Sequence, residues 1–273
     1  MDFYGCHFEY AGEFSRKYGL IIAAVTATRN ISVTGKSQSV HIFNKRNQTK
    51  SNLGSMYSEA PLVFEMEIIA EEPIDGEIRR KIQKWLFNQT DYQKLYLDRA
   101  EANVGEIFEL VSGRPVRTYL NCLFVNPEKI EGDGGIMGYK FSVECDSRMA
   151  WQDPVRVSAN YPGGETASEM ITACVDTDTV EYTYPTIEIN TGDIGGTIEI
   201  TNLSDDPGRT TTFSDIAPNT HFTINGVYNY VSNGYYGNFI NRNFPRLLDG
   251  TNEFALSGDI TAISITWQNT RYL

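Results

Sequence analysis

The sequence is poor in the features on which several classes of protein depend. No uninterrupted apolar run in its 273 residues approaches the roughly 20 residues needed to span a bilayer. The opening segment, MDFYGCHFEY, lacks a basic stretch followed by an apolar one, so it does not read as a secretion signal. These absences argue against membrane insertion and predict a protein that is made and kept in the cytosol.

Residues that bind metals or form disulfides are also scarce and poorly spaced. The four cysteines form no C-x-x-C pair, which argues against a zinc site and a dense disulfide scaffold and favours buried free thiols. The three histidines occupy three separate segments, none at ligand spacing from paired carboxylates. These residues are Cys6, Cys122, Cys145, Cys174, His7, His41 and His221. We therefore predict no metal site.

Catalytic motifs are missing as well. The sequence has no P-loop, no G-x-S-x-G, no H-E-x-x-H and no G-x-G-x-x-G after a strand. The adjacent carboxylates Asp205 and Asp206 precede Pro207, where a turn explains them better than glycoside hydrolysis does. No catalytic residue and no cofactor is predicted, and the protein is not expected to be an enzyme.

What the sequence does contain favours strands joined by turns. It has 23 glycines and 10 prolines, is 41% hydrophobic and shows few long helical patterns, so the class is mainly β. Its length exceeds the usual single domain of about 100–150 residues. Residues 163–273 carry 4 basic and 14 acidic side chains and hold most of the net charge of −12. We predict a first domain at 1–155, a boundary region at 156–182 and a second domain at 183–273.

One amphipathic helix stands out in the first domain, within DGEIRRKIQKWLFN. Asp75 can cap its start, and Glu77 suits the positive N-terminal end. A helix of about 13 residues is too short to be stable alone in water, so its apolar stripe must cover a sheet. The strand that follows, at 92–97, closes a strand–helix–strand unit. The predicted core of this unit is Ile78, Ile82, Trp85, Leu86, Tyr92 and Leu95. Further strands are predicted at 61–70, 106–113, 117–127 and 138–147.

A basic, polar segment at 34–60 reads as a long loop or flexible hairpin. Lysine and arginine could neutralise DNA phosphates, but the segment lacks the interleaved aromatics of a single-strand platform. Contact with another subunit is favoured over DNA contact and over simple solvated disorder. The basic residues proposed for that contact are Lys36, Lys45, Arg46 and Lys50.

The second domain reads as short strands separated by turn residues, which is typical of a β-sandwich. Its stretch NYVSNGYYGNF places tyrosines among asparagine and glycine. Exposed aromatics of this kind can stack on sugar rings, although packing or protein contact is the favoured interpretation. The candidate sugar or partner contacts are Tyr235, Tyr236 and Trp267.

Four segments resemble the siphophage distal tail protein family. They are FYGCHFEYAGEFSRKYGLII, the helix and strand IRRKIQKWLFNQTDYQKLYLD, and YPTIEI together with FPRLLDGTNEFALSG. The second is the most specific. The family commonly has Pro-Gly where this chain has Asp249-Gly250, a change compatible with a turn. The resemblance implies an N-terminal tail-tube-like β-barrel or sandwich with one packed helix and a C-terminal galectin-like or carbohydrate-module-like sandwich.

The resemblance also implies a function. Related proteins form a homohexameric ring at the tail tip that joins the tail-tube protein to the tail-associated hub and holds receptor-binding or baseplate proteins. DNA passes through the lumen of such a ring without specific binding. We accordingly expect a structural virion protein, assembled in the host cytoplasm. A carbohydrate-binding adhesin and a tail-tube protein of the same architecture are the alternatives.

Overall fold

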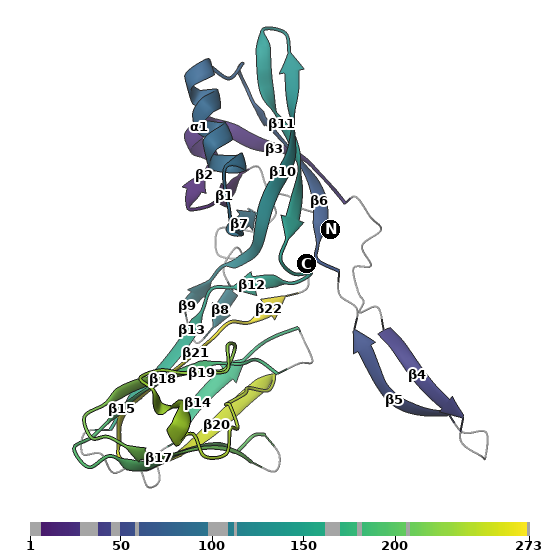
Figure 1. Ribbon diagram of the computed structural model, residues 1–273. Helices are drawn as coiled ribbons and strands as arrows, with labels where there is room; N and C mark the ends of the chain where they lie inside the picture. The colour runs from purple at the N-terminus through teal and green to yellow at the C-terminus, as the bar shows by residue number, and fades with distance from the viewer. Residues whose placement is uncertain are drawn as a thin grey trace. The chain divides into compact units, whose positions relative to one another are not determined.

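The computed structural model describes residues 7–27, 38–44, 50–57, 60–97, 109–111, 114–161, 170–178, 182–205 and 208–271 (Figure 1). The chain divides into two compact units, one mostly before Trp151 and one mostly from Gln152 onward. The sequence-based prediction of a mainly β protein is confirmed, since the described residues form one α-helix and many antiparallel strands.

The first unit is built on an antiparallel sheet with the order β2-β1-β7-β10-β11-β6-β3, and β12 also pairs with β10. The strands are β1 (Phe8–Tyr10), β2 (Glu13–Phe14), β3 (Leu20–Ala27), β6 (Val63–Ala70), β7 (Gln93–Leu97), β10 (Thr118–Gly132), β11 (Gly135–Cys145) and β12 (Ala150–Gln152). Alternation of apolar and polar residues in β6 and β11 turns one face of the sheet toward the core.

This sheet must curl. Its two terminal strands, β2 and β3, are joined only by a short 3-10 helix, η1 (Ser15–Tyr18). In a flat sheet, the six spacings of about 4.8 Å would put these edges roughly 29 Å apart. The connection from Phe14 to Leu20 reaches at most about 20 Å even when fully extended. The strands therefore bend around the core like an open barrel.

Helix α1 (Gly76–Phe87) covers that core. The Asp75 carboxylate accepts a 3.0 Å hydrogen bond from the Glu77 amide, which confirms the predicted cap. The helix packs against β10, and Ile82, Trp85 and Leu86 are buried. The predicted strand–helix–strand arrangement is present, because β7 follows the helix and pairs with β10.

Two residues assigned to the core by sequence lie outside it. Ile78 is 42% exposed, because the helix face is buried only from its second turn onward, at Ile82. Tyr92 is 47% exposed. Residues two positions apart along a strand point to the same face, so Tyr92 lies on the side of the exposed Lys94. Leu95, the next residue in the alternation, points to the core and is buried.

The remaining predictions for the first unit are met in part. The strands expected at 61–70, 117–127 and 138–147 correspond to β6, β10 and β11, with β10 and β11 forming a longer hairpin than expected. The strand expected at 106–113 is described only over residues 109–111, and that part does not join this sheet. Its described part, β8 (Glu109–Val111), pairs only with β9 (Arg114–Val116). The basic segment contains a separate hairpin of β4 (Gln38–Asn44) and β5 (Lys50–Tyr57).

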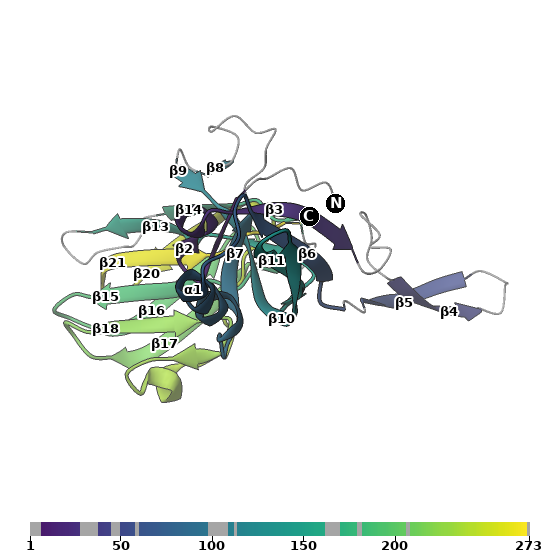
Figure 2. The same ribbon diagram turned by 90° about the horizontal axis from the view of Figure 1, so that it is seen from above.

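The second unit is a β-sandwich of two antiparallel sheets, with orders β13-β21-β15-β18-β19 and β14-β20-β16-β17. In Figure 2 the strands of the two sheets overlie one another, and one buried apolar cluster contains residues from both. A short strand, β22 (Thr270–Arg271), pairs with β12, and a 3-10 helix, η2 (Tyr235–Asn238), follows β19. The strands of the two sheets are β13 (Val155–Asn160), β14 (Met170–Val175), β15 (Thr186–Thr191), β16 (Gly196–Asn202), β17 (Arg209–Ile216), β18 (His221–Asn225), β19 (Tyr230–Val231), β20 (Gly250–Ser257) and β21 (Ile260–Trp267).

The boundary region predicted at 156–182 instead contains β13 and β14, which belong to the sandwich. In β14 buried and exposed residues alternate without a break. The proline and glycine on which the prediction rested flank these strands. The division between the units falls near Trp151.

Candidate functional site

Trp85 fixes the helix to the sheet of the first unit. Its indole N–H donates a 2.7 Å hydrogen bond to the Tyr10 carbonyl, and its ring is only 6% exposed. The ring stacks on Phe8 with centroids 5.6 Å apart and on Tyr18 with centroids 5.1 Å apart. An indole that is buried, stacked and hydrogen-bonded in this way packs the core and leaves no polar atom free for a ligand.

A second group of contacts joins the start of β1 to η1 and to the start of β3. The Ser15 hydroxyl accepts a 3.1 Å hydrogen bond from the Phe8 amide, and His7 Nδ1 lies 3.5 Å from the same hydroxyl. His7 Nδ1 also lies 3.3 Å from the carbonyl oxygen of Leu20, at the start of β3. These contacts hold β1 and β3 near each other and account for His7 as a structural residue.

The outer edge of β3 is the candidate assembly surface of this unit. Among the strands that the structure describes, β3 pairs with β6 alone, and its Ala23 and Thr26 are exposed. An edge strand presents backbone N–H and C=O groups that another chain can pair with. At eight residues, β3 is long enough for such pairing, while the opposite edge, β2, has two residues.

In the second unit, the three predicted contact residues have different environments. Trp267 is 2% exposed and donates a 3.0 Å hydrogen bond to Asn269, so it belongs to the core. Tyr235 packs against the core cluster, and its hydroxyl lies 3.4 Å from that of Thr220. Tyr236 is 48% exposed, and the Arg242 guanidinium covers its ring at 4.1 Å. Of the three, only Tyr236 offers a substantial aromatic surface to a partner.

Sequence reasoning identified only part of a more exposed group of apolar residues, since the stretch NYVSNGYYGNF includes Tyr230 but not Tyr184, Val227 or Tyr228. The backbone of Gly226 lies against Tyr184, since a Cβ at Gly226 would be 3.2 Å from the Tyr184 Cβ. Val227 and Tyr228, next along the chain, are 61% and 80% exposed, and Tyr230 is 56% exposed. We call Tyr184, Val227, Tyr228 and Tyr230 the tyrosine surface. The sequence signal for it is the alternation in VYNY after the Asn225-Gly226 turn.

Asp205, which the sequence placed in a turn, also has a charged partner. Its carboxylate accepts two hydrogen bonds from Arg246, of 2.6 and 3.0 Å, and its side chain is 4% exposed. The Arg246 guanidinium lies 3.7 Å from the centroid of the Tyr182 ring. The hydrogen bond to Asp205 is the main cause that raises the pKa of Arg246. This is a structural ion pair, since both charges are satisfied within the fold.

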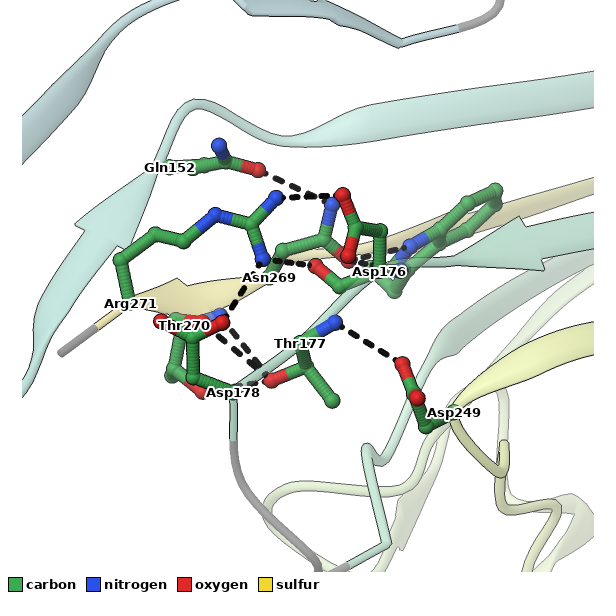
Figure 3. Close-up of polar contacts among 9 residues, drawn as sticks. Gln152, Asp176, Thr177, Asp178, Asp249, Asn269, Thr270 and Arg271 are labelled. Atoms are coloured by element: carbon green, nitrogen blue, oxygen red, sulfur yellow. Dashed lines mark hydrogen bonds and ion pairs between the residues drawn. The ribbon is translucent and has the colours of Figure 1, made fainter.

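A polar cluster closes the sandwich where the chain enters and leaves it (Figure 3). Asn269 is fully buried, and its amide donates a 3.0 Å hydrogen bond to the Gln152 side chain. Arg271 forms a 2.7 Å ion pair with Asp176 at the end of β14. These contacts join the first and last residues of the unit, so the cluster serves stability.

Metal-binding side chains do not converge in the described part of the chain. No group of three His, Cys, Asp or Glu side chains in it could hold a metal ion. None of the helices that the structure describes is long and apolar enough to cross a membrane. Lys36, Lys45 and Arg46 lie outside the described residues, and Lys50 is the first residue of β5.

Comparison with solved structures finds chains of similar fold. The fold is similar to that of the Dit protein (gp 19.1) of phage SPP1, with a TM-score of 0.62 at 11% identity, covering 97% of this chain and 98% of that one. It is also similar to a chain of the phage p2 baseplate in its activated conformation with strontium, with a TM-score of 0.50 at 8% identity over 96% and 97%. The first is described as a paradigm of the hub adsorption apparatus in phages that infect Gram-positive bacteria.

Sequence comparison gives a second, independent result. No curated protein sequence matches significantly. A family model described as a phage tail protein N-terminal domain matches residues 3–147. A model described as a phage tail C-terminal domain matches residues 152–267, so the two models meet close to the division between the units. The chain therefore belongs to the phage tail protein family.

Proposed function

We propose that this chain is the distal tail protein of a long-tailed phage or related particle, and that six copies form a ring at the tail tip. The observation that carries the proposal is the similarity to SPP1 Dit, which covers 97% of this chain and 98% of that protein and so includes both units. The role is structural and needs no covalent chemistry.

The edge of β3 supports ring closure. A ring forms when one surface of a protomer fits a different surface of the next and the rotation closes. Backbone pairing at an exposed strand edge supplies such a contact without large apolar patches. The basic segment at 34–60, with Lys36, Lys45, Arg46 and Lys50, then contacts an adjacent subunit or the next ring. The lumen lets DNA pass without specific binding.

The sandwich supplies the outward docking face in this proposal. The tyrosine surface places tyrosine rings on the exterior, and tyrosine is enriched where proteins bind each other. Receptor-binding or other baseplate proteins dock there, while the tail-tube and tail-associated hub proteins bind the faces of the ring. The protein thus acts as an adaptor at the virion tail tip, after assembly in the host cytoplasm.

Mass photometry and negative-stain microscopy of the purified protein test the ring. We expect a species of about six times 30.7 kDa and ring-shaped particles with a central hole. The double variant Ala23→Lys/Thr26→Lys places charges on the β3 edge and should shift the population to monomers. Thr197→Lys, an exposed position in the central strand β16, is the matched control and should assemble normally. A wild-type protein that stays monomeric at high concentration refutes the ring.

A carbohydrate-binding adhesin is the second candidate, favoured by the exposed rings of Tyr228, Tyr230 and Tyr236. A glycan array with the wild type and with alanine at these positions tests it. Phe14→Ala, at a ring of similar exposure in the first unit, is the control. Sugar binding that disappears only in the tyrosine variants, with assembly intact, would favour this function.

A further inference from the structure

Cys122 and Cys145 lie directly opposite each other on β10 and β11. The Asp146 amide donates a 2.9 Å hydrogen bond to the Asn121 carbonyl, while the Cys145 amide turns away from β10 to the Leu62 carbonyl, also at 2.9 Å. No ladder bond runs from the Cys145 amide to Cys122. The two cysteines therefore form a non-hydrogen-bonded pair of the antiparallel ladder, in which opposing Cα atoms are about 4.5 Å apart.

This separation suits a disulfide. Disulfides join residues whose Cα atoms are about 4.4–6.8 Å apart and whose Cβ atoms are about 3.5–4.5 Å apart. Opposing Cβ atoms in antiparallel strands are about 4.5–5.5 Å apart, and non-hydrogen-bonded pairs lie at the close end of that range. Both residues are buried, with exposures of 0% and 2%, so their side chains lie on the same, core-facing side of the hairpin. Closing the bond requires little movement of the strands.

We propose that Cys122 and Cys145 are a redox-active dithiol that a low-molecular-weight disulfide, of the oxidised glutathione class, converts into a cross-strand disulfide. The thiolate of one cysteine attacks a sulfur of the small disulfide, forms a mixed disulfide and releases one small thiolate. The second cysteine then attacks the protein sulfur of the mixed disulfide and releases the other small thiolate. The two protein thiol protons end on the two released thiols, so the small disulfide is reduced as the protein pair is oxidised.

Burial makes the folded protein react slowly. Desolvation, followed by the contact with Cys145, raises the pKa of the Cys122 thiol, so little attacking thiolate is present at neutral pH. A small disulfide reaches either sulfur only when the hairpin or its cover opens. Cys174, in contrast, lies exposed in β14 and reacts without opening. The pair consequently oxidises during folding or by slow local opening.

The bond would fasten the base of the β10–β11 hairpin inside the core that α1 covers. The Tyr10 hydroxyl, 3.4 Å from the Cys122 carbonyl, belongs to the same core as Trp85. The cytosol keeps thiols reduced, and extracellular surroundings oxidise them. If the chain is a virion protein, as the proposed function has it, the folded pair oxidises by slow local opening after release of the particle. The chemistry of the pair itself does not depend on that function.

The test is refolding of the full-length protein at defined ratios of reduced to oxidised glutathione. The variant Cys6→Ser/Cys174→Ser removes the other two cysteines. After quenching by alkylation, we expect an unalkylated protein whose intact mass is two hydrogen atoms below that of the unmodified reduced protein. Trypsin should release residues 118–129 and 141–148 as one linked species. Thermal unfolding of the oxidised form should occur roughly 5–10 °C above the reduced form.

Two controls separate the possible outcomes. Adding Cys122→Ala, or Cys145→Ala, to the same background should abolish the linked peptides and leave at most a glutathione adduct. Refolding exposes both sulfurs, so slow access cannot hide the bond. Two alkylated thiols at every glutathione ratio would overturn the proposal, as would linked peptides accompanied by loss of the native fold. Ring assembly is measured on the same samples, and a monomer that forms the disulfide would contradict the proposed function alone.

Discussion

The indole N–H of Trp85 donates a 2.7 Å hydrogen bond to the backbone carbonyl of Tyr10, although the two residues are 75 positions apart in the chain. The contact joins the last turns of α1 to the strand β1. A buried carbonyl and a buried indole nitrogen satisfy each other, while the ring packs between Phe8 and Tyr18. The helix is therefore held in one position by a directional bond as well as by apolar packing.

Removing this side chain should destabilise the first unit strongly. Trp85→Ala is expected to lower the free energy of unfolding by about 3–5 kcal/mol through lost burial and a cavity. Trp85→Phe keeps part of the packing but leaves the Tyr10 carbonyl unpaired, at a cost of about 1–3 kcal/mol. Ile78→Ala, on the exposed first turn of the same helix, should stay within about 0.5 kcal/mol. Urea unfolding measures all three variants. Equal losses of unfolding free energy for Trp85→Ala and Ile78→Ala would contradict the role of Trp85 in holding the helix on the sheet.

The ion pair of Asp205 and Arg246 should matter more than an exposed pair in the same unit. Asp205→Ala leaves a guanidinium without its partner and should cost about 2–4 kcal/mol, somewhat less than full burial implies because Arg246 is partly exposed. The pair of Arg156 and Glu188 is largely in solvent, so Arg156→Ala should cost at most about 1 kcal/mol. Chemical denaturation measures the free energy of unfolding of both variants. Similar losses of free energy would contradict the larger contribution of the Asp205–Arg246 pair.

The sequence predicted elements whose residues carry a strong local pattern. The Asp75 cap, the buried stripe at Ile82, Trp85 and Leu86, and the alternation in β6 and β11 all follow from spacings of three to four or of two residues. Such periods report which side of an element is buried. They do not report how far a neighbouring element extends, and for this reason Ile78 was wrongly placed in the core.

The candidate surfaces were harder to predict because exposure depends on partners distant in sequence. Trp267 and Tyr236 are both aromatic residues of the second unit, yet one is enclosed by the sandwich core and the other lies under Arg242. Asp205 was correctly placed near a turn, but its pairing with Arg246 joins segments 41 residues apart. Predicting that Cys122 and Cys145 lie opposite each other requires the register of β10 and β11, and irregularities shift that register at two points in the hairpin.

Alkaline pH should destabilise the first unit. Burial, followed by the nearby Cys122, raises the pKa of Tyr10, and burial raises the pKa of Cys122. Both groups hold their protons more tightly when folded, so their contribution is complete below the ordinary values of about 8.5 for cysteine and 10 for tyrosine, and is lost as pH rises above them. Thermal unfolding should show a falling midpoint between about pH 9 and 11. The double variant Tyr10→Phe/Cys122→Ala should have a flatter pH profile, and an unchanged slope would contradict this assignment.

A glycine is required at position 138, where β11 pairs with β6. A Cβ at this position would lie 1.9 Å from the carbonyl oxygen of Ile68, a backbone atom that cannot move without breaking the pairing of the two strands. Gly138→Ala should therefore cost about 3 kcal/mol or more and weaken protection of the β6 amides in hydrogen exchange. Gly76→Ala, at the open first position of α1, meets no atom within 4 Å and should be neutral or stabilise the helix by up to about 1 kcal/mol. If both substitutions leave the unfolding midpoint unchanged, the strands do not approach each other as closely as this register requires.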